Sequence, residues 1–354
     1  ALKALEALKK TTDLKILFVS STTGIDDGNF NQNSYKGVTD FIEEYTKCSA
    51  DTLMEETGRP KECRRFLEEN ISKYDVIVCA GYLFARIGEI AEKNPSKYFI
   101  LIDSDLKYTD GSNALSPNVY AMTFSEEESG FLAGVSAAME TKSGKVAIVT
   151  GIPYASNVNY QYGFMSGVKY VNETQRNNVK CIELEDHSGV DANSNPVGGN
   201  YVGAFNDPDS GKKIAEELIA EGVDIIFVAA GESGNGVFDA IKEADGVMAI
   251  GCDVDQYDLG KTDNGNIVLT SVIKRLDLNV KKQLENIAAG KFMGGNFILD
   301  ATSESTGYVG EDGRHQLSET TLTALSNVYK LLKSGSIVPA SYYNGITPET
   351  FSSK

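Results

Sequence analysis

Short apolar runs alternate along this chain with segments whose apolar residues recur at helical spacing. Most of the runs are continuously apolar, as expected for strands that helices cover on both faces. Because helical segments separate the runs, the pattern predicts βαβ units and parallel sheets, an α/β fold. The predicted strands lie at 15–20, 75–80, 98–103, 119–124, 145–150, 179–184, 224–229, 247–251 and 267–272, and the predicted helices at 33–45, 61–70, 82–93, 126–140, 160–171, 210–220, 234–243, 275–289 and 318–333.

The predicted strands are more than one open sheet usually contains, and 354 residues are more than a single hydrophobic core usually supports. Two α/β lobes are therefore expected. We place the first crossing between them near Phe124, just before the acidic segment Glu126-Glu127-Glu128. Carboxylates suit the partial positive charge at the start of a helix, so this segment indicates a helix N-terminus rather than a catalytic triple acid.

Two segments interrupt the regular alternation. Residues 186–203 form a loop rich in Gly, Asn and Ser without periodicity, and loops of this length are usually functional or mobile. Residues 1–10 predict a helical lead, which would be a tether, a tag remnant or a capping helix. The chain starts at Ala1 rather than Met, which suggests a processed or trimmed N-terminus.

Charge and cysteine usage narrow the range of partners. The chain has 33 Lys and Arg against 50 Asp and Glu, a net charge of −17. So acidic a chain repels nucleic acid phosphates and anionic lipid headgroups, and we expect neither as a partner. The five cysteines form no CxxC pair, and Cys79 and Cys252 lie in apolar runs, so we expect core thiols and neither a disulfide framework nor a zinc site. No apolar run reaches the roughly 20 residues that a membrane-spanning helix needs.

The sequence carries no motif that indicates catalysis. Residues 260–262 end a near match to the phosphate-binding pattern GxxxxGK[ST], but Asp255 replaces its first glycine and would repel phosphate. Residues 231–236 follow a predicted strand but lack the spacing of GxGxxG. There is no GxSxG nucleophile elbow, and His187 and His315 are far apart in the sequence. We therefore expect no catalytic residue, no metal ion and no cofactor.

Residues that suit ligand binding instead recur where predicted strands end. The longest such stretch is 24–32, GIDDGNFNQ, which lies between a predicted strand and a predicted helix. In parallel α/β sheets, ligands bind at the carboxyl ends of the strands. Each position alone has an ordinary explanation as a turn, a helix cap or a core aromatic, but their recurrence at corresponding strand ends favours a binding site. The other strand-end candidates are Asp103, Phe205, Gly231, Asp253 and Lys274.

Six blocks occur in order between residues 14 and 300, at 24–32, 124–134, 163–167, 205–208, 250–256 and 270–275. Together they resemble the basic membrane protein family, also called the PnrA-like lipoproteins. Members of that family are substrate-binding proteins of ABC transporters. The resemblance implies a type I periplasmic-binding fold, in which three crossover segments join two doubly wound parallel-sheet lobes and the ligand lies in the cleft between them. It implies an N-terminal lobe of residues 13–123 plus 254–295 and a C-terminal lobe of residues 124–253 plus 296–354.

Many members of the family bind purine nucleosides, and the resemblance implies which residues would contact the base. Phe30 and Phe205 would stack on its two faces. Stacking suits a nucleobase because every base presents a π-face. Asn31 and Asp103 would form hydrogen bonds with the edge of the base.

The remaining candidates would contact the sugar. By the same resemblance, Asp253, the backbone of Gly231 and Lys274 would hold the ribose hydroxyls, and Asp27 would line or brace the same pocket. A buried carboxylate bonded to two vicinal hydroxyls rejects deoxy analogues, because its acceptor atoms would be left unpaired.

The resemblance thus implies a monomeric, non-enzymatic protein outside the cytoplasm that hands a purine nucleoside to an ABC permease. The lipid-bearing cysteine of such lipoproteins would precede Ala1, and anchoring to the membrane is expected on that basis. Gly28 and the long 186–203 loop depart from the family pattern, and we expect the first to widen the mouth of the pocket and the second to cover it. Two alternatives stay open: a receptor for a sugar or signalling molecule on the same fold, and a nucleoside-processing enzyme.

Overall fold

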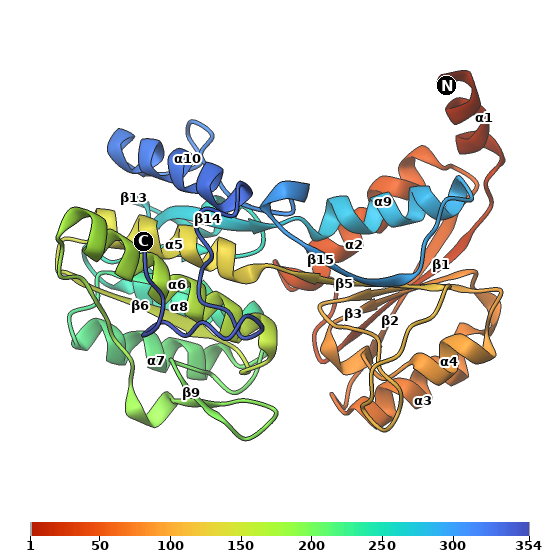
Figure 1. Cartoon of the computed structure of the whole chain (residues 1–354), viewed down its shortest axis with the longest axis horizontal. Coiled ribbons are helices and arrows are strands. Elements are labelled where there is room, and N and C mark those ends of the chain that lie inside the picture. Colours follow the sequence, from red (N-terminus) through yellow and green to blue (C-terminus); the bar gives the residue numbers. More distant parts are fainter. Residues whose placement is uncertain (1, 354) are drawn as a thin grey trace. The chain divides into compact units, whose positions relative to one another are not determined.

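In the computed structural model, which describes residues 2–353, the chain forms two compact units (Figure 1). Unit 1 comprises the chain up to Thr123 together with Leu276–Leu299, and unit 2 comprises Phe124–Arg275 together with the chain from Asp300 onward. The chain therefore passes from one unit to the other three times. In the described part of the chain, each unit is built on a six-stranded sheet with helices on both faces, which confirms the predicted α/β class.

Unit 1 has the strand order β15-β5-β4-β3-β1-β2, with α2 and α9 on one face of the sheet and α3 and α4 on the other (Figure 1). The strands from β5 to β2 all run parallel. Alternate side chains of a strand point to opposite faces, so Leu17 and Ile77 pack against Leu67 of α3 in one buried cluster. The elements of this unit are α1 (Leu2–Thr11), β1 (Lys15–Ser21), α2 (Phe30–Glu44), β2 (Ser49–Glu55), α3 (Pro60–Asn70), η1 (Ile71–Lys73), β3 (Val76–Ala80), η2 (Tyr82–Phe84), α4 (Gly88–Lys93), β4 (Tyr98–Ile102), β5 (Val119–Phe124), α9 (Leu276–Ala288) and β15 (Gly295–Leu299).

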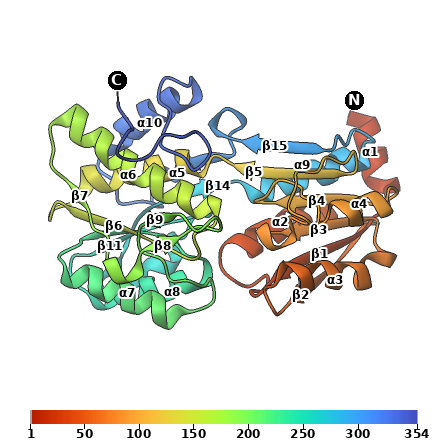
Figure 2. The ribbon, with the colours of Figure 1, turned by 60° about the horizontal axis from the view of Figure 1, so that its bottom comes forward.

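Unit 2 has the strand order β16-β14-β11-β10-β6-β7, with α5, α6 and α10 on one face and α7 and α8 on the other (Figure 2). Only β16 runs antiparallel to its neighbour among the described strands of this sheet. Ile148 and Phe227 pack against the α5–α6 layer, whereas Val149 and Val228 pack against α7 and α8. The elements are α5 (Glu126–Glu140), β6 (Lys145–Thr150), α6 (Ala155–Gln175), β7 (Lys180–Cys181), η3 (Glu185–His187), β8 (Gly189–Val190), β9 (Pro196–Gly198), α7 (Pro208–Ala220), β10 (Ile225–Ala229), η4 (Gly231–Ser233), α8 (Gly234–Glu243), β11 (Met248–Gly251), η5 (Tyr257–Gly260), β12 (Lys261–Thr262), β13 (Gly265–Asn266), β14 (Val268–Lys274), η6 (Ala301–Ser303), β16 (Thr306–Tyr308) and α10 (Glu319–Lys333).

Glycines allow α5 and α6 to pack backbone against backbone. A Cβ atom on Gly134 would lie 2.1 Å from the carbonyl oxygen of Phe164, and one on Gly163 would lie 2.2 Å from that of Glu127. Both distances are far inside van der Waals contact, so any larger residue would push the helices apart. Gly130 and Gly167 make equally close approaches across the same contact. Two of the blocks that carry the family resemblance therefore have a packing role.

The lobe boundaries differ from the sequence prediction at two places. Residues 254–275, predicted for the N-terminal lobe, belong to unit 2, because β14 pairs with β11 and is buried within that sheet. Residues 296–299, predicted for the C-terminal lobe, belong to unit 1, where β15 lies beside β5 at the edge of the sheet. An apolar run predicts a strand, but tertiary contacts decide which sheet the strand joins.

Local elements also differ from their predictions. The predicted helix 82–93 is interrupted, because Ala85 and Gly88 each form a 2.9 Å backbone hydrogen bond with Lys107 instead of continuing the helix. The predicted strand 179–184 contains only the two residues of β7. The sequence pattern does not reveal β2, whose side chains are mostly exposed or half-buried.

The predicted helical lead is present as α1, and Ala1 lies outside the described residues. Among the helices of residues 2–353, none combines the length and the apolar character needed to cross a membrane.

Candidate functional site

In unit 1, the loop after β1 is organised by Asp27. Its carboxylate accepts hydrogen bonds from the backbone N–H groups of Asn29 (3.0 Å), Asn31 (2.8 Å) and Gln32 (2.9 Å). They belong to the N-cap residue Asn29 and to the first turn of α2, where backbone N–H groups have no partner within the helix. Asp27 therefore fixes the loop and the start of α2.

Phe30 and Asn31 are the first two residues of α2, so the Asp27 cap sets their positions. The Asn31 side chain is buried, and its amide group donates to the carbonyl oxygen (3.2 Å) and the hydroxyl (2.7 Å) of Thr23. Phe30 is half-buried and lies over the end of β3, since a Cβ atom on Gly81 would stand 3.9 Å from Cε1 of its ring.

Two further polar groups lie at this edge of the first sheet. Asp103 directly follows β4, the neighbour of β3, and has a left-handed backbone with φ 58°. Asn29, which the sequence did not single out, has a buried side-chain oxygen that no donor among the described residues reaches. The structure thus brings Asp27, Phe30, Asn31 and Asp103 to the carboxyl ends of three adjacent strands of unit 1.

In unit 2, Phe205 lies at the carboxyl ends of β6 and β10. A Cβ atom on Gly151, just after β6, would lie 2.2 Å from Cε1 of the Phe205 ring, so the ring occupies the space that this glycine leaves. Gly231, just after β10, has a φ of 58° and would place a Cβ atom 3.3 Å from Phe205 Cδ1. The backbone N–H of Ser233 donates to the Phe205 carbonyl (2.9 Å), and the ring of Tyr154 lies 6.1 Å away between centroids.

The next two strands of the same sheet are β11 and β14; Asp253 lies just after β11, and Lys274 is the last residue of β14. Asp253 is 8% exposed and left-handed (φ 65°), and its Oδ1 accepts a 2.6 Å hydrogen bond from the hydroxyl of Tyr160. Lys274 is 1% exposed, and its Nζ lies 2.9 Å from Glu126 Oε1 and 5.0 Å from the centroid of the Phe124 ring. A buried ammonium group needs such a partner, because desolvation of an unpaired charge is costly.

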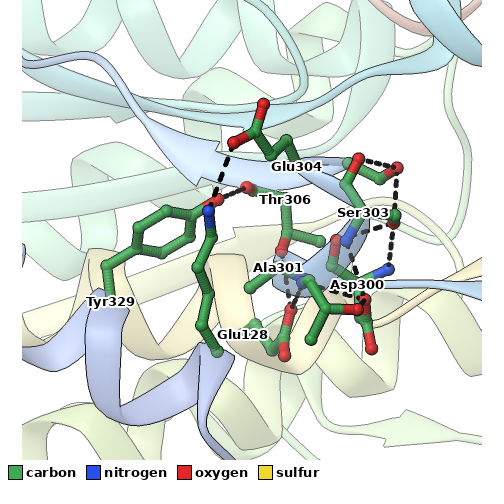
Figure 3. Close-up of polar contacts among 10 residues, drawn as sticks. Glu128, Asp300, Ala301, Ser303, Glu304, Thr306 and Tyr329 are labelled. Atoms are coloured by element: carbon green, nitrogen blue, oxygen red, sulfur yellow. Dashed lines mark hydrogen bonds and ion pairs between the residues drawn. The ribbon is translucent and has the colours of Figure 1, made fainter.

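The acidic segment Glu126-Glu127-Glu128 forms the first turn of α5, as predicted, but all three side chains also have specific surroundings. Glu126 pairs with Lys274. Burial and the neighbouring Glu126 raise the pKa of Glu127 to about 8, and no donor among the described residues reaches its buried Oε2. Burial also raises the pKa of Glu128, whose Oε2 accepts from the backbone of Ala301 (2.7 Å) and the hydroxyl of Thr306 (2.6 Å), as Figure 3 shows.

Helix α6 supports these strand ends with polar side chains that sequence reasoning did not identify. Asn157 donates to the carbonyl of Ala229 at the end of β10 (2.9 Å), and Asn159 donates to Glu126 Oε2 (3.0 Å). Burial, together with the Asp253 charge, raises the pKa of Tyr160 well above its ordinary value, so its hydroxyl remains a donor. A signal is present in the sequence, since 157–161 places Asn, Asn, Tyr and Gln around one valine in a helix that packs on the core.

The 186–203 loop is anchored within unit 2. Its Asp191 carboxylate accepts from the backbone of Asn193 and Asn195 (2.8 Å each) and from the hydroxyl of Tyr342 (2.8 Å). His187, at the start of the loop, lies 2.9 Å from a Glu217 carboxylate oxygen. No cluster of three His, Cys, Asp or Glu side chains in the described part of the chain has the arrangement of a metal site.

A model of the ABC transporter substrate-binding protein family described as PnrA-like matches residues 15–191 and 189–310. The chain is 31% identical over 305 residues to the CD4+ T-cell-stimulating antigen of Listeria innocua, covering 82% of this chain and 78% of that protein. It is 29% identical to the ABC transporter nucleoside-binding protein BmpA of Lactococcus lactis, covering 82% and 79%. Its fold resembles that of an ABC transporter solute-binding protein from Aeropyrum pernix, with a TM-score of 0.76, 22% identity and 94% of each chain covered.

Proposed function

Because the chain belongs to the PnrA-like family of ABC transporter substrate-binding proteins, we propose that it binds a purine nucleoside and delivers it to a membrane permease. The observation that carries the proposal is the chemistry of the strand ends. Each unit presents a half-buried phenylalanine there, and unit 2 adds a buried carboxylate and a buried ammonium group. The Lactococcus lactis relative, whose name describes it as nucleoside-binding, supports the same ligand class.

The aromatic residues suit the base of such a ligand. We propose that Phe30 and Phe205 each stack on the purine, and that Asn31 and Asp103 form hydrogen bonds with its edge. The Asp27-capped turn fixes the backbone that carries Phe30, and the Phe205 ring fills the space at Gly151. Rings fixed in advance lose little entropy on binding, so stacking contributes more of its energy to affinity.

The polar residues of unit 2 suit the sugar. We propose that Asp253, Lys274 and the backbone of Gly231 hold the ribose hydroxyls. A carboxylate accepts from two vicinal hydroxyls at once, whereas a deoxy analogue leaves buried acceptor capacity unpaired. The site should therefore prefer ribonucleosides.

Isothermal titration calorimetry with adenosine, guanosine and inosine tests the ligand class, and native mass spectrometry of the purified protein tests whether a compound of nucleoside mass copurifies. Phe30→Ala and Phe205→Ala should each weaken binding by about 1–3 kcal/mol. Phe66→Ala is a matched control, because it removes a half-buried ring from α3, on the opposite face of the unit 1 sheet from α2.

Absence of binding to all three nucleosides would refute the proposal. Binding of a sugar alone, unaffected by Phe30→Ala, would favour a receptor for that sugar. Release of free base from inosine in the presence of phosphate would instead indicate a nucleoside-processing enzyme.

We further propose, from the family alone, that the protein acts outside the cytoplasm, anchored by a lipid and as a monomer. Analytical ultracentrifugation of the ligand-free and ligand-bound protein tests the last of these points.

A further inference from the structure

We propose that Tyr160 is a positioning residue, whose buried hydroxyl orients the Asp253 carboxylate and thereby sets how strongly the protein prefers a ribose over a deoxyribose. The inference rests on the proposed function, since it takes Asp253 as the group that binds the sugar hydroxyls. Tyr160 itself is assigned no contact with the ligand.

The hydrogen bond between the two side chains gives the two carboxylate oxygens of Asp253 different partners. The Tyr160 hydroxyl lies 2.6 Å from Asp253 Oδ1, and the thiol of Cys252 lies 3.5 Å from the same oxygen. No donor to Oδ2 is found among the described residues. Oδ1 is thus used by the protein, and Oδ2 keeps both of its acceptor sites for the hydroxyls of a ligand.

The backbone of Asp253 is also held. Its φ of 65° lies in the left-handed region, which aspartate tolerates better than most residues. Its carbonyl accepts a 3.0 Å hydrogen bond from the backbone N–H of Lys274 on the neighbouring strand. With backbone and Oδ1 both fixed, the remaining freedom of the carboxylate is small.

Tyr160 is a rigid support for this carboxylate. The residue is 4% exposed, and its ring packs edge-to-face on Phe227 of β10, with centroids 5.7 Å apart. Its carbonyl lies where a Cβ atom on Gly130 would stand only 2.4 Å away, so the close contact of α5 with α6 fixes its main chain. A side chain held at both ends positions its hydroxyl without the entropy cost of ordering it on binding.

Loss of the Tyr160 hydroxyl should therefore weaken binding of the sugar hydroxyls and leave binding of the base unchanged. In Tyr160→Phe, Oδ1 loses its strongest donor, and the carboxylate can turn away from the geometry that suits a vicinal diol. A hydrogen bond to a charged group corresponds to about tenfold or more in affinity, so adenosine should bind about tenfold more weakly. The affinity for 2′,3′-dideoxyadenosine, which has no vicinal hydroxyls, should not change.

The experiment measures the dissociation constants of adenosine and 2′,3′-dideoxyadenosine for the wild type, Tyr160→Phe and Tyr74→Phe. Tyr74 is a matched control, because it is also a buried tyrosine whose hydroxyl donates to an aspartate, Asp51 (2.7 Å), but it precedes β3, at the end of that strand opposite to the candidate residues. Neither Tyr74 nor Asp51 is a candidate site residue. The expected result is that the preference for adenosine falls about tenfold in Tyr160→Phe and is retained in Tyr74→Phe.

Three results would overturn the inference. Equal weakening of both ligands in Tyr160→Phe would show a general structural role, and an unchanged preference would show that the hydroxyl does not orient Asp253. In both cases the wild type still binds adenosine, so the proposed function stands. Failure of the wild type to bind any nucleoside would overturn the proposed function and this inference together.

A second measurement does not depend on the folding of Tyr160→Phe. In NMR spectra with tyrosines labelled by 13C at Cζ, the wild type should show one buried tyrosine signal whose chemical shift changes with adenosine but not with 2′,3′-dideoxyadenosine. In Asp253→Asn, the same signal should be displaced in the absence of ligand. Identical shifts with both ligands would contradict a link between a tyrosine hydroxyl and the sugar.

Discussion

Replacing Glu127 by glutamine removes a half-buried carboxyl group, whose Oε2 is fully buried, from the first turn of α5. Burial and the neighbouring carboxylate of Glu126 raise the pKa of Glu127 from 4.5 to about 8, so the folded protein holds a proton that the unfolded chain releases. Between these two pKa values, the unfolded state binds fewer protons than the folded state. Stability should therefore fall as pH rises from about 4.5 to about 8 and level off above that.

The size of the effect follows from the shift. Each unit of pKa difference corresponds to about 1.4 kcal/mol, so the cost reaches roughly 3 kcal/mol at pH 7 and approaches roughly 5 kcal/mol above pH 8. These are upper limits, because water penetration and local relaxation reduce the energy of a buried charge. Glutamine has nearly the same shape and does not ionise, so Glu127→Gln should be more stable than the wild type at pH 7 and about equally stable at pH 4.

The assay is urea unfolding of both proteins at pH 4, 5, 6, 7 and 8, with the difference in free energy of unfolding plotted against pH. Glu319→Gln is the control for the exchange itself, because Glu319 also lies in the first turn of a helix, α10, but is exposed. A difference between Glu127→Gln and the wild type that does not grow with pH would refute the reasoning.

Two further predictions concern packing and thiol chemistry. Gly134→Ala should lower the free energy of unfolding by about 1–3 kcal/mol or prevent folding, because its Cβ atom would overlap the Phe164 carbonyl. Gly24→Ala, where the structure leaves open space, is the comparison in the same thermal unfolding measurement. The cysteine thiols should react slowly with Ellman's reagent at pH 8 in the native protein and quickly after denaturation. The reason is that thiolates are the reactive form, and burial raises the pKa of Cys63 and Cys181 to about 12. Fast labelling of a native thiol would contradict that expectation.

The sequence predicts much of the fold because helix and strand periodicities are local. Buried strands such as β3 and β10 are apolar throughout, and they lie close to their predicted positions. The periodicity of apolar residues does not predict strands whose side chains are weakly buried, or interruptions of a helix by backbone hydrogen bonds to other segments. β2 has mostly exposed or half-buried side chains, and the helix predicted at 82–93 is interrupted by backbone bonds to Lys107.

The residues of the candidate site likewise include some that the sequence predicts and some that it does not. Residues that directly follow strands, such as Asp103 and Asp253, can be proposed from sequence because parallel strands bring their carboxyl ends to one edge. The residues that hold them cannot, since Tyr160 reaches Asp253 across 93 positions of the chain and Glu126 reaches Lys274 only after β14 joins the second sheet. The acidic segment 126–128 shows the difference between a local property and one that depends on tertiary packing. Its place at a helix start is a local property, whereas the raised pKa of Glu127 depends on what packs around it.

Helix α6 links the stability of unit 2 to its chemistry. Within about one turn of α6, three side chains form these contacts. Asn157 donates to the end of β10, Tyr160 donates to Asp253 after β11, and Asn159 donates to the Glu126 that pairs with Lys274 at the end of β14. The position of that helix is set a few residues further on, where Gly163 lets it approach the backbone of α5. A displacement of α6 would shift all three supports at once. Substitutions in the α5–α6 contact should consequently change both the unfolding free energy and the ribose preference, even though none of the contact residues is assigned to the ligand.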